Sequence, residues 1–397
     1  MSDEPPEQQA VQLPFEEELD PSIEGEPEIE AAARKAISVV ALTATDWTAE
    51  TILSQLARGN IELNPRFQRR DAWTPIRKAR FIESLFLGLP IPQLVLAEHP
   101  GRRGTYLVLD GKQRLLSLRQ FASTEDDAFR PLVLNHLELR SDLNGKTLAM
   151  IEADESLTDD LNAFQNQTIR TVVVRNWPDD AFLYLVFLRL NTGSLPLSPQ
   201  ELRQALLPGP FTDYLDDASS ASPGLQSALQ INGPDFRMRD VELLLRFLAF
   251  DFFLSEYTGN LKLFLDTTCE RLNKSWASDE EAIADRVSAC EAAIEATQDV
   301  FGTNHAFQRW SGERYEGRFN RAIFDVMVFF FKDPQIRSAA TGKKAEVVES
   351  FKRLCEQDPD FNRYVQTTTK STEATFSRFG KWRERLSEAL GMEIPQP

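Results

Sequence analysis

From Asp179 to the C-terminus, the apolar residues recur every three or four positions. This spacing places them on one face of a helix, and it repeats in one segment after another. The segments read "DDAFLYLVFLRLNTG", "SPQELRQALLPG", "RDVELLLRFLAFDFFL", "LKLFLDTTCERLNK", "SDEEAIADRVSACEAAIEATQDVF", "FNRAIFDVMVFFF" and "FSRFGKWRERLSEALG". The second half of the chain is therefore predicted to be an all-helical domain.

The first half mixes helical segments with short apolar runs. In "TPIRKARFIESLFLGLP", Thr74 and Pro75 can start a helix and Gly88 can end it, while "DWTAETILSQLARGN" predicts a helix capped by Asp46 or Thr48. The runs "QLVLAE" and "TYLVLD" flank "HPGRRG", which predicts a hairpin, and "PLVLNHLEL" and "TIRTVVVRN" are further strand candidates. We expect an α+β fold here, followed by the helical domain.

Charge is concentrated at the start of the chain. The 397 residues carry a formal charge of -17, and residues 1–30 hold eleven Asp and Glu without a Lys or Arg, so the remainder carries -17 + 11 = -6. Such a composition cannot bury enough apolar surface to offset the entropy of ordering. We predict a disordered acidic tail at 1–35, which serves either as a solubilising leader or as a decoy for a basic surface, then domains at 36–178 and 179–397.

The longest apolar runs, "AFLYLVFL" and "IFDVMVFFF", are much shorter than the ~20 residues that span a bilayer. We therefore expect no membrane partner and a cytoplasmic location. Cys269, Cys290 and Cys355 are widely spaced and form no CxxC pair, which is typical of reduced thiols in a core.

The stretch "YLVLDGKQRLLSLRQF" runs from a strand through Asp110 and Gly111 directly into a helix. A helix start presents backbone N–H groups and the positive end of the helix dipole, which together favour an anion. Lys112 and Arg114 would add a point charge and a planar fork suited to phosphate. The junction predicts a phosphate site, although a strand-to-helix turn can also carry these cations for solubility alone. The pattern GxxxxGK[ST] of a Walker loop is absent.

A basic patch lies in "NPRFQRRDAW" and "IRKAR". Its cations are Arg66, Arg69, Arg70, Arg77, Lys78 and Arg80. Phe67 and Trp73 are interleaved with them, a pattern that suits stacking of a base beside a phosphate. The patch is either a DNA-binding surface, with Arg66, Arg70, Arg77 and Arg80 as its contacts, or a solvated helix face with two core aromatics.

Four segments in order, "FQRRDAW", "RFIESLFLGLPIPQLVL", "VLDGKQRLLSL" and "FLRLNTGSLPLSPQELRQAL", resemble the N-terminal domain family of GmrSD-type restriction endonucleases. The resemblance implies a ParB/sulfiredoxin-like fold in which a D-G-Q-Q-R motif binds and hydrolyses a nucleotide. The implied catalytic residues are Asp110 and Gln113. The implied nucleotide-binding residues are Gly111, Lys112, Arg114, Gln68, Arg69 and Trp73. Asn191, Gly193 and Glu201 fall on a later motif, which could instead fix the helical domain to the first.

Two departures from the family shape the expected activity. Lys112 replaces the first Gln of the motif, and no segment matches the C-terminal His-Asn nuclease module, so we do not expect an autonomous nuclease of that kind. We expect a sensor or regulatory protein of defence against phage or modified DNA that binds a nucleoside triphosphate, with Mg²⁺, and hydrolyses it. DNA and a separate effector nuclease subunit are the expected partners. The alternatives are a non-catalytic DNA-binding module and a phosphotransferase of the ParB/sulfiredoxin type.

Overall fold

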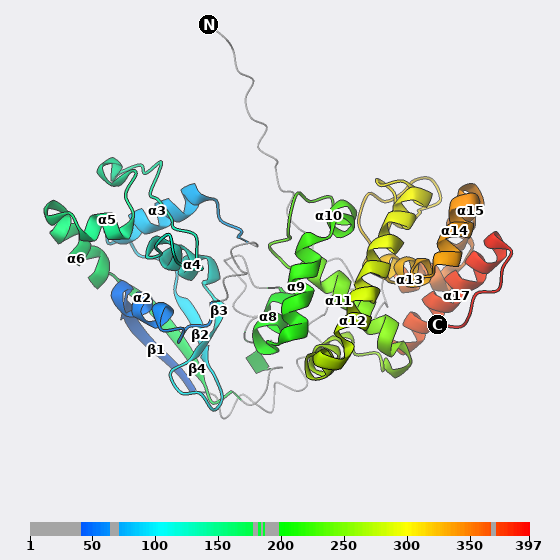
Figure 1. The fold of residues 1–397 in the computed structure, drawn as a ribbon, viewed down its shortest axis with the longest axis horizontal. Helices are drawn as coiled ribbons and strands as arrows, with labels where there is room; N and C mark the ends of the chain where they lie inside the picture. The colour runs from blue at the N-terminus through cyan, green and yellow to red at the C-terminus, as the bar shows by residue number, and fades with distance from the viewer. Residues whose placement is uncertain (1–40, 64–70, 178–181, 184–185, 187–197, 367–370) are drawn as a thin grey trace, which may run out of the picture. The chain divides into compact units, whose positions relative to one another are not determined.

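The computed structural model describes residues 41–63, 71–177, 182, 183, 186, 198–366 and 371–397 (Figure 1). Among these residues the chain divides into two compact units. One contains residues up to 249 and 265–291, and the other contains 250–264 and 292–397. The expected tail at 1–35 lies outside the described residues, and the domain boundary expected at residue 178 stays a prediction. The unit with the sheet also holds helices α8 (Pro199–Leu206), α9 (Pro210–Ala221) and α10 (Pro223–Leu229).

The sheet has four strands in the order β1-β4-β2-β3. The strands are β1 (Ala41–Thr48), β2 (Leu94–Glu98), β3 (Tyr106–Asp110) and β4 (Thr168–Arg175). β2 and β3 form the expected antiparallel hairpin, whereas β4 pairs antiparallel with β1 and parallel with β2. The last strand in the sequence thus lies inside the sheet, between two earlier ones.

Short helices follow the first strands and cover one face of the sheet. They are α2 (Ala49–Ala57), α3 (Pro75–Phe86), α4 (Lys112–Phe121), α5 (Leu148–Glu152) and α6 (Thr158–Asn166), with single 3-10 turns at Ser141–Leu143 and Glu155–Leu157. Thr48 and Thr74 cap α2 and α3, and Pro75 stands at the first position of α3. Asp46, the other expected cap, lies in β1 instead.

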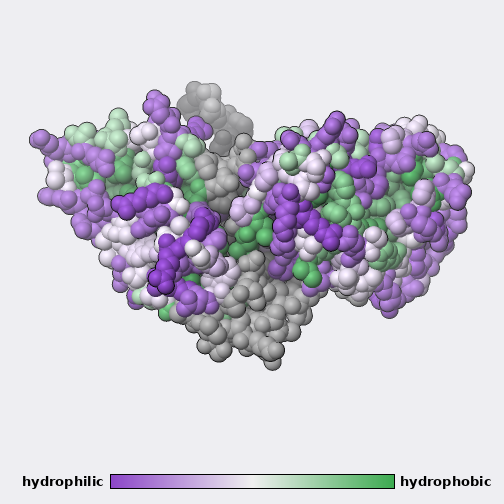
Figure 2. Space-filling view, turned by 60° about the horizontal axis from the view of Figure 1, so that its bottom comes forward, coloured by the Kyte–Doolittle hydropathy of each residue, from purple (hydrophilic) through white to green (hydrophobic). Residues whose placement is uncertain are grey.

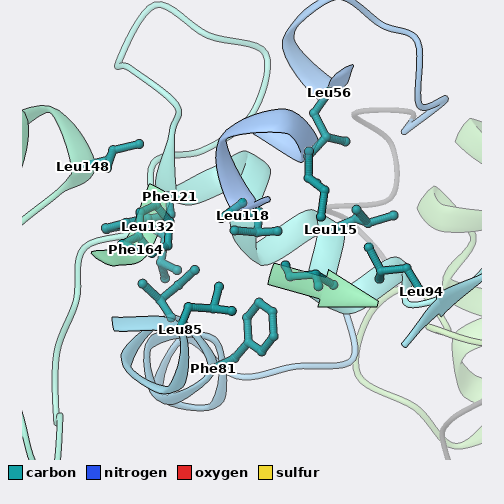
Figure 3. Packing of buried hydrophobic residues seen from close by; sticks show 14 of the residues in the cluster. Leu56, Phe81, Leu85, Leu94, Leu115, Leu118, Phe121, Leu132, Leu148 and Phe164 are labelled. Atoms are coloured by element: carbon teal, nitrogen blue, oxygen red, sulfur yellow. The ribbon is translucent and has the colours of Figure 1, made fainter. Parts of the chain in front are cut away.

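Alternation along β2 gives the sheet two cores. Leu94 and Leu96 face a large cluster with α2, α3, α4 and α6, in which Phe86 stacks on Phe164 with ring centroids 4.8 Å apart. Figure 3 shows side chains of these helices meeting around Leu118 and Phe121. Val95 and Ala97 point to the other face, where α8 contributes Leu202. β2 is therefore buried on both sides, as its continuous apolar run requires.

The other long elements of the described chain are helices. In the unit with the sheet these are α8 (Pro199–Leu206), α9 (Pro210–Ala221) and α10 (Pro223–Leu229); α11 (Arg239–Phe253) and α12 (Leu261–Phe301) contribute residues to both units. The other unit adds a 3-10 turn (Leu254–Glu256), α13 (Arg321–Phe331), α14 (Pro334–Gly342), α15 (Lys344–Gln357), α16 (Pro359–Gln366) and α17 (Thr372–Leu390). The expected α+β class with a helical C-terminal region is confirmed.

Two local expectations were wrong, and one helix expectation lies largely outside the described residues. "PLVLNHLEL" forms no strand, because its backbone N–H groups bond to separate partners. Leu132 N donates to Gln120 O and Leu134 N to Lys146 O, and the end of the segment is held by a side chain of α3, described below. The segments expected as helices at 261–274 and 278–301 form the single 41-residue helix α12. The helix expected in "DDAFLYLVFLRLNTG" is described only at residues 182, 183 and 186.

The described surface mixes hydrophilic and apolar residues on the face drawn in Figure 2. No helix in the described ranges is both long and apolar enough to cross a membrane. The side chains of Cys269, Cys290 and Cys355 are buried, as expected for cysteines in a core.

Candidate functional site

The junction between β3 and α4 is built on Gly111. This residue precedes the helix as its N-cap with a φ of 98°, in the left-handed region that glycine adopts readily. A Cβ at this position would lie 2.3 Å from Leu94 Cδ2, so the sheet also excludes a side chain. The glycine therefore lets β3 turn directly into α4 and leaves the helix start without a side-chain cap.

Arg114 folds back over this helix start. Its side chain is 7% exposed, and its Nη2 donates to Asp110 Oδ2 at 2.9 Å. Nε and Nη2 both lie 3.2 Å from the position that a Gly111 Cβ would occupy. Among the described residues, Nε has no hydrogen-bond acceptor although it is buried. A buried donor without an acceptor is costly, and here it lies at the positive end of a helix.

Lys112 occupies the first position of α4 and points elsewhere. Its Nζ donates to Glu201 Oε1 at 2.6 Å, and the two side chains are 7% and 6% exposed. Glu201 belongs to α8, so this buried ion pair joins the first turn of α4 to a helix 89 positions later in the sequence. The expectation that the later motif fixes helices to the first domain agrees with this contact.

Glu201 also organises the start of α8. Its Oε2 accepts a hydrogen bond from Ser198 N at 2.7 Å, and Ser198 Oγ accepts from Glu201 N at 3.0 Å, which is a capping box. Our sequence analysis missed Ser198, although the signature Ser-x-x-Glu before an apolar run could have revealed it. Asn191 and Gly193, from the same motif, lie outside the described residues.

The remaining residues of the motif lie around this junction. Asp110 ends β3 and is 20% exposed at its side chain, and Gln113 is half-buried in the first turn of α4. Their expected catalytic roles stay predictions. In the described ranges, no group of three or more His, Cys, Asp and Glu residues could hold a metal ion.

Trp73 is partly buried and packs against the core. It packs edge-on against Phe81 with ring centroids 5.8 Å apart, and the guanidinium of Arg77 lies 4.7 Å from its ring centroid. A base that stacked on this ring would have to displace Arg77. Gln68 and Arg69, expected beside Trp73, lie outside the described residues.

The expected basic patch is only partly described. Arg66 and Arg70 lie outside the described residues, whereas Arg77 and Arg80 are exposed on α3. Arg80 pairs with Glu138 at 2.6 Å at the surface. The patch therefore retains two described cations on one exposed helix.

Lys78 was wrongly counted with this patch, because it is only 4% exposed. It contacts Asp71 and donates to Gln120 Oε1 of α4 at 2.6 Å. Burial lowers the pKa of Lys78 to about 8. The lysine thus ties the segment after the "FQRR" motif to α4 and offers no charge to solvent.

Comparison with known proteins identifies the domain that carries this junction. Residues 50–208 match a family model described as the GmrSD restriction endonuclease, N-terminal domain. No curated protein and no solved structure matches the chain. The match includes Asp110, Lys112 and Arg114 as well as Glu201, so both halves of the buried ion pair fall within it. This family implies a role in restriction, the defence against modified DNA. We conclude that residues 50–208 form a domain that matches the GmrSD restriction endonuclease N-terminal domain family.

Proposed function

We propose that this domain binds a nucleoside triphosphate at the start of α4, hydrolyses it, and serves as a sensor or regulatory module in defence against modified foreign DNA. One observation carries the proposal: Arg114 Nε is a buried donor without an acceptor among the described residues, and it lies at a helix start that has no side-chain cap. A phosphate oxygen would supply the missing acceptor. The family supports the defence role.

The residues present fit a phosphate group. Arg114 is held in place by Asp110, so its guanidinium is already oriented before a ligand arrives and loses little entropy on binding. Backbone N–H groups of the first turn and the helix dipole favour the same negative charge. Lys112 stands at the first position of the helix, and its ammonium is paired with Glu201.

In hydrolysis, Asp110 and Gln113 would be the catalytic residues. When bound, the triphosphate supplies the phosphoanhydride bond that is broken. Asp110 would position an attacking water or a Mg²⁺ ion, since its carboxylate is partly exposed at the end of β3. Gln113 would hold the water through its amide. Trp73 would face the base only if Arg77 moved from its ring.

The experiment that tests this proposal is a calorimetric titration of nucleotides, with and without Mg²⁺, into wild type and Arg114→Ala. A charge-assisted hydrogen bond contributes roughly 1.5 to 3 kcal/mol, so the variant should bind about 10- to 150-fold more weakly. Phosphate release, measured in parallel, reports hydrolysis. Label that moves to an acceptor instead would indicate the phosphotransferase.

Arg119→Ala is the matched control. Arg119 is in the same helix and pairs with Asp127 at 2.7 Å, but it lies near the other end of α4. Its loss should lower stability without changing nucleotide affinity. If Arg114→Ala binds nucleotide as wild type does, the phosphate site is elsewhere and the "DGKQR" segment is only a turn.

Binding of DNA through α3 is a second candidate, favoured by the exposure of Arg77 and Arg80 three positions apart on that helix. Removing one cation that binds a DNA phosphate should lower the salt slope of binding by about one unit. A folded Arg77→Glu, Arg80→Glu variant with the wild-type salt slope would exclude α3 from the interface.

A further inference from the structure

The ion pair between Lys112 and Glu201 places a carboxylate beside the site proposed above. Lys112 starts α4, directly after Gly111, yet its ammonium is taken by Glu201 of α8 in a pair that is almost fully buried. Arg114, two positions later, is held by Asp110 within the same strand-to-helix turn. One cation of the junction is thus fixed locally, and the other is held by a distant helix.

Three successive residues of α8 make three different contacts. Glu201 binds Lys112 of α4, and Leu202 packs on the second face of the sheet. Arg203 Nε donates to Asp266 Oδ1 of α12 at 2.6 Å. α8 therefore connects the start of α4 to the helices that follow in the same unit.

We propose that an anionic ligand at the start of α4 competes with Glu201 for the ammonium of Lys112, so that ligand occupancy is linked to the docking of α8. This inference rests on the proposed function. The lysine side chain can reach either acceptor because it is a point charge on four flexible carbons. A polyphosphate brings several charges to the helix start, whereas Glu201 brings one.

Thermodynamic linkage makes the effect reciprocal. If a phosphate chain draws Lys112 from Glu201, it weakens the hold of α8 on α4; conversely, weakening that hold must strengthen phosphate binding by the same factor. Glu201 keeps its second oxygen on Ser198 N, so α8 retains its own N-terminal cap when Lys112 leaves. Loss of the contact between Lys112 and Glu201 would therefore change how α8 packs on α4, while the N-terminus of α8 stays capped.

The test titrates inorganic triphosphate into wild type, Glu201→Gln and Lys112→Gln by calorimetry. The amide oxygen of Gln at position 201 can still accept from Ser198 N, while the carboxylate that holds Lys112 is removed. Glu201→Gln should bind triphosphate roughly 5- to 150-fold more tightly than wild type, the usual range of coupling between sites. Lys112→Gln should bind it more weakly than wild type.

Asp266→Asn is the matched control, because it removes the ion pair of α8 with α12 and leaves Lys112 with Glu201. Because the competing carboxylate stays on Lys112, it should raise triphosphate affinity much less than Glu201→Gln does. Hydrogen exchange provides a second measurement on the unmodified chain. Saturating triphosphate should speed exchange in residues 199–206 of wild type and leave it unchanged in Lys112→Gln.

The outcomes separate the two proposals. If wild type binds triphosphate and a folded Glu201→Gln binds it no more tightly, the competition is refuted while the phosphate site stands. If Glu201→Gln does not fold, the hydrogen-exchange measurement decides. An exchange rate of residues 199–206 that is the same in wild type with and without triphosphate also refutes the competition. If no folded variant, wild type included, binds triphosphate or nucleotide, the phosphate site itself fails and the competition fails with it.

Discussion

Lys78 illustrates how burial changes the charge of a single residue. Its ammonium lies between Asp71 and Gln120, and burial lowers its pKa to about 8, compared with ~10.4 in an unfolded chain. Between these two values the unfolded chain holds a proton that the folded chain has released. Stability should therefore rise with pH across this window, and the full cost of the buried charge is present below it.

We expect the unfolding free energy of wild type, relative to Lys78→Met, to rise by roughly 3 kcal/mol between pH 8 and pH 10.5. Urea denaturation of both proteins at several pH values in this range measures the difference. Arg80→Met, at an exposed position of the same helix, should show no such rise. A difference that falls with pH would mean that the Asp71 carboxylate outweighs burial and holds the folded pKa above the unfolded one.

At this scale the sequence singled out the residues of the candidate site, whose roles stay predictions, but it did not indicate their partners. The motif identified Lys112 and Arg114, and the glycine before them indicated the helix start. Glu201 as the partner of Lys112 depends on how α8 packs against the sheet, and no local pattern encodes that distance. Lys78 looked like a surface cation because its neighbours in the sequence are charged, yet a helical turn separates exposed from buried positions.

At the scale of elements, the side chain of Glu83 holds the end of a segment that was expected to be a strand. Its Oε1 accepts hydrogen bonds from the backbone N–H of Leu139 and Arg140, both at 2.7 Å, and its Oε2 accepts one from Glu138 at 3.3 Å. Burial alone would raise the pKa of Glu83, but these donors and Arg80 lower it. Backbone groups that a strand partner would use are thus held by α3.

Glu83→Gln should destabilise the fold by about 1 to 3 kcal/mol, because it replaces a charged acceptor of three backbone N–H groups by a neutral one. The lowered pKa means that this stabilisation is present above about pH 4.5 and is lost as the pH falls through the folded value. Glu138→Gln, which removes only an exposed pair with Arg80, should cost much less. Thermal unfolding at pH 7 of the three proteins compares the costs, and equal costs would contradict the anchoring role of Glu83.

Elements with strong local signals were predicted well. The helix α3 was predicted from Thr74, Pro75 and its apolar face. The hairpin of β2 and β3 was predicted from "HPGRRG". β1 was missed because "ATDWT" reads equally as a helix start, and its strand pairing with β4 involves residues more than 100 positions away. The single helix α12 was divided at "WASDEE", whose polar residues are compatible with a helix as well as with a turn.

At the scale of the whole molecule, charge separates the tail from the rest. Residues 1–35 hold eleven Asp and Glu and two Lys and Arg, so removing them changes the formal charge from -17 to -17 + 11 - 2 = -8. We expect a chain that lacks residues 1–35 to melt within a few degrees of wild type, and to elute from heparin at higher salt because it repels polyanions less. Differential scanning calorimetry and heparin chromatography test the two effects. A melting temperature lower by ten degrees would show that the tail contributes to the fold.

The position of β4 inside the sheet has a consequence for biosynthesis. β2 ends at Glu98 and β4 begins at Thr168, 70 residues later, and until then both β1 and β2 lack the neighbour that lies between them. At ~5 to 20 residues per second the ribosome needs roughly 4 to 14 seconds to supply it. During that interval the nascent chain carries two unpaired strand edges, which readily join other chains. Chaperones that bind such edges would therefore meet this protein before residue 168 is made, and a message truncated there would yield an aggregating product.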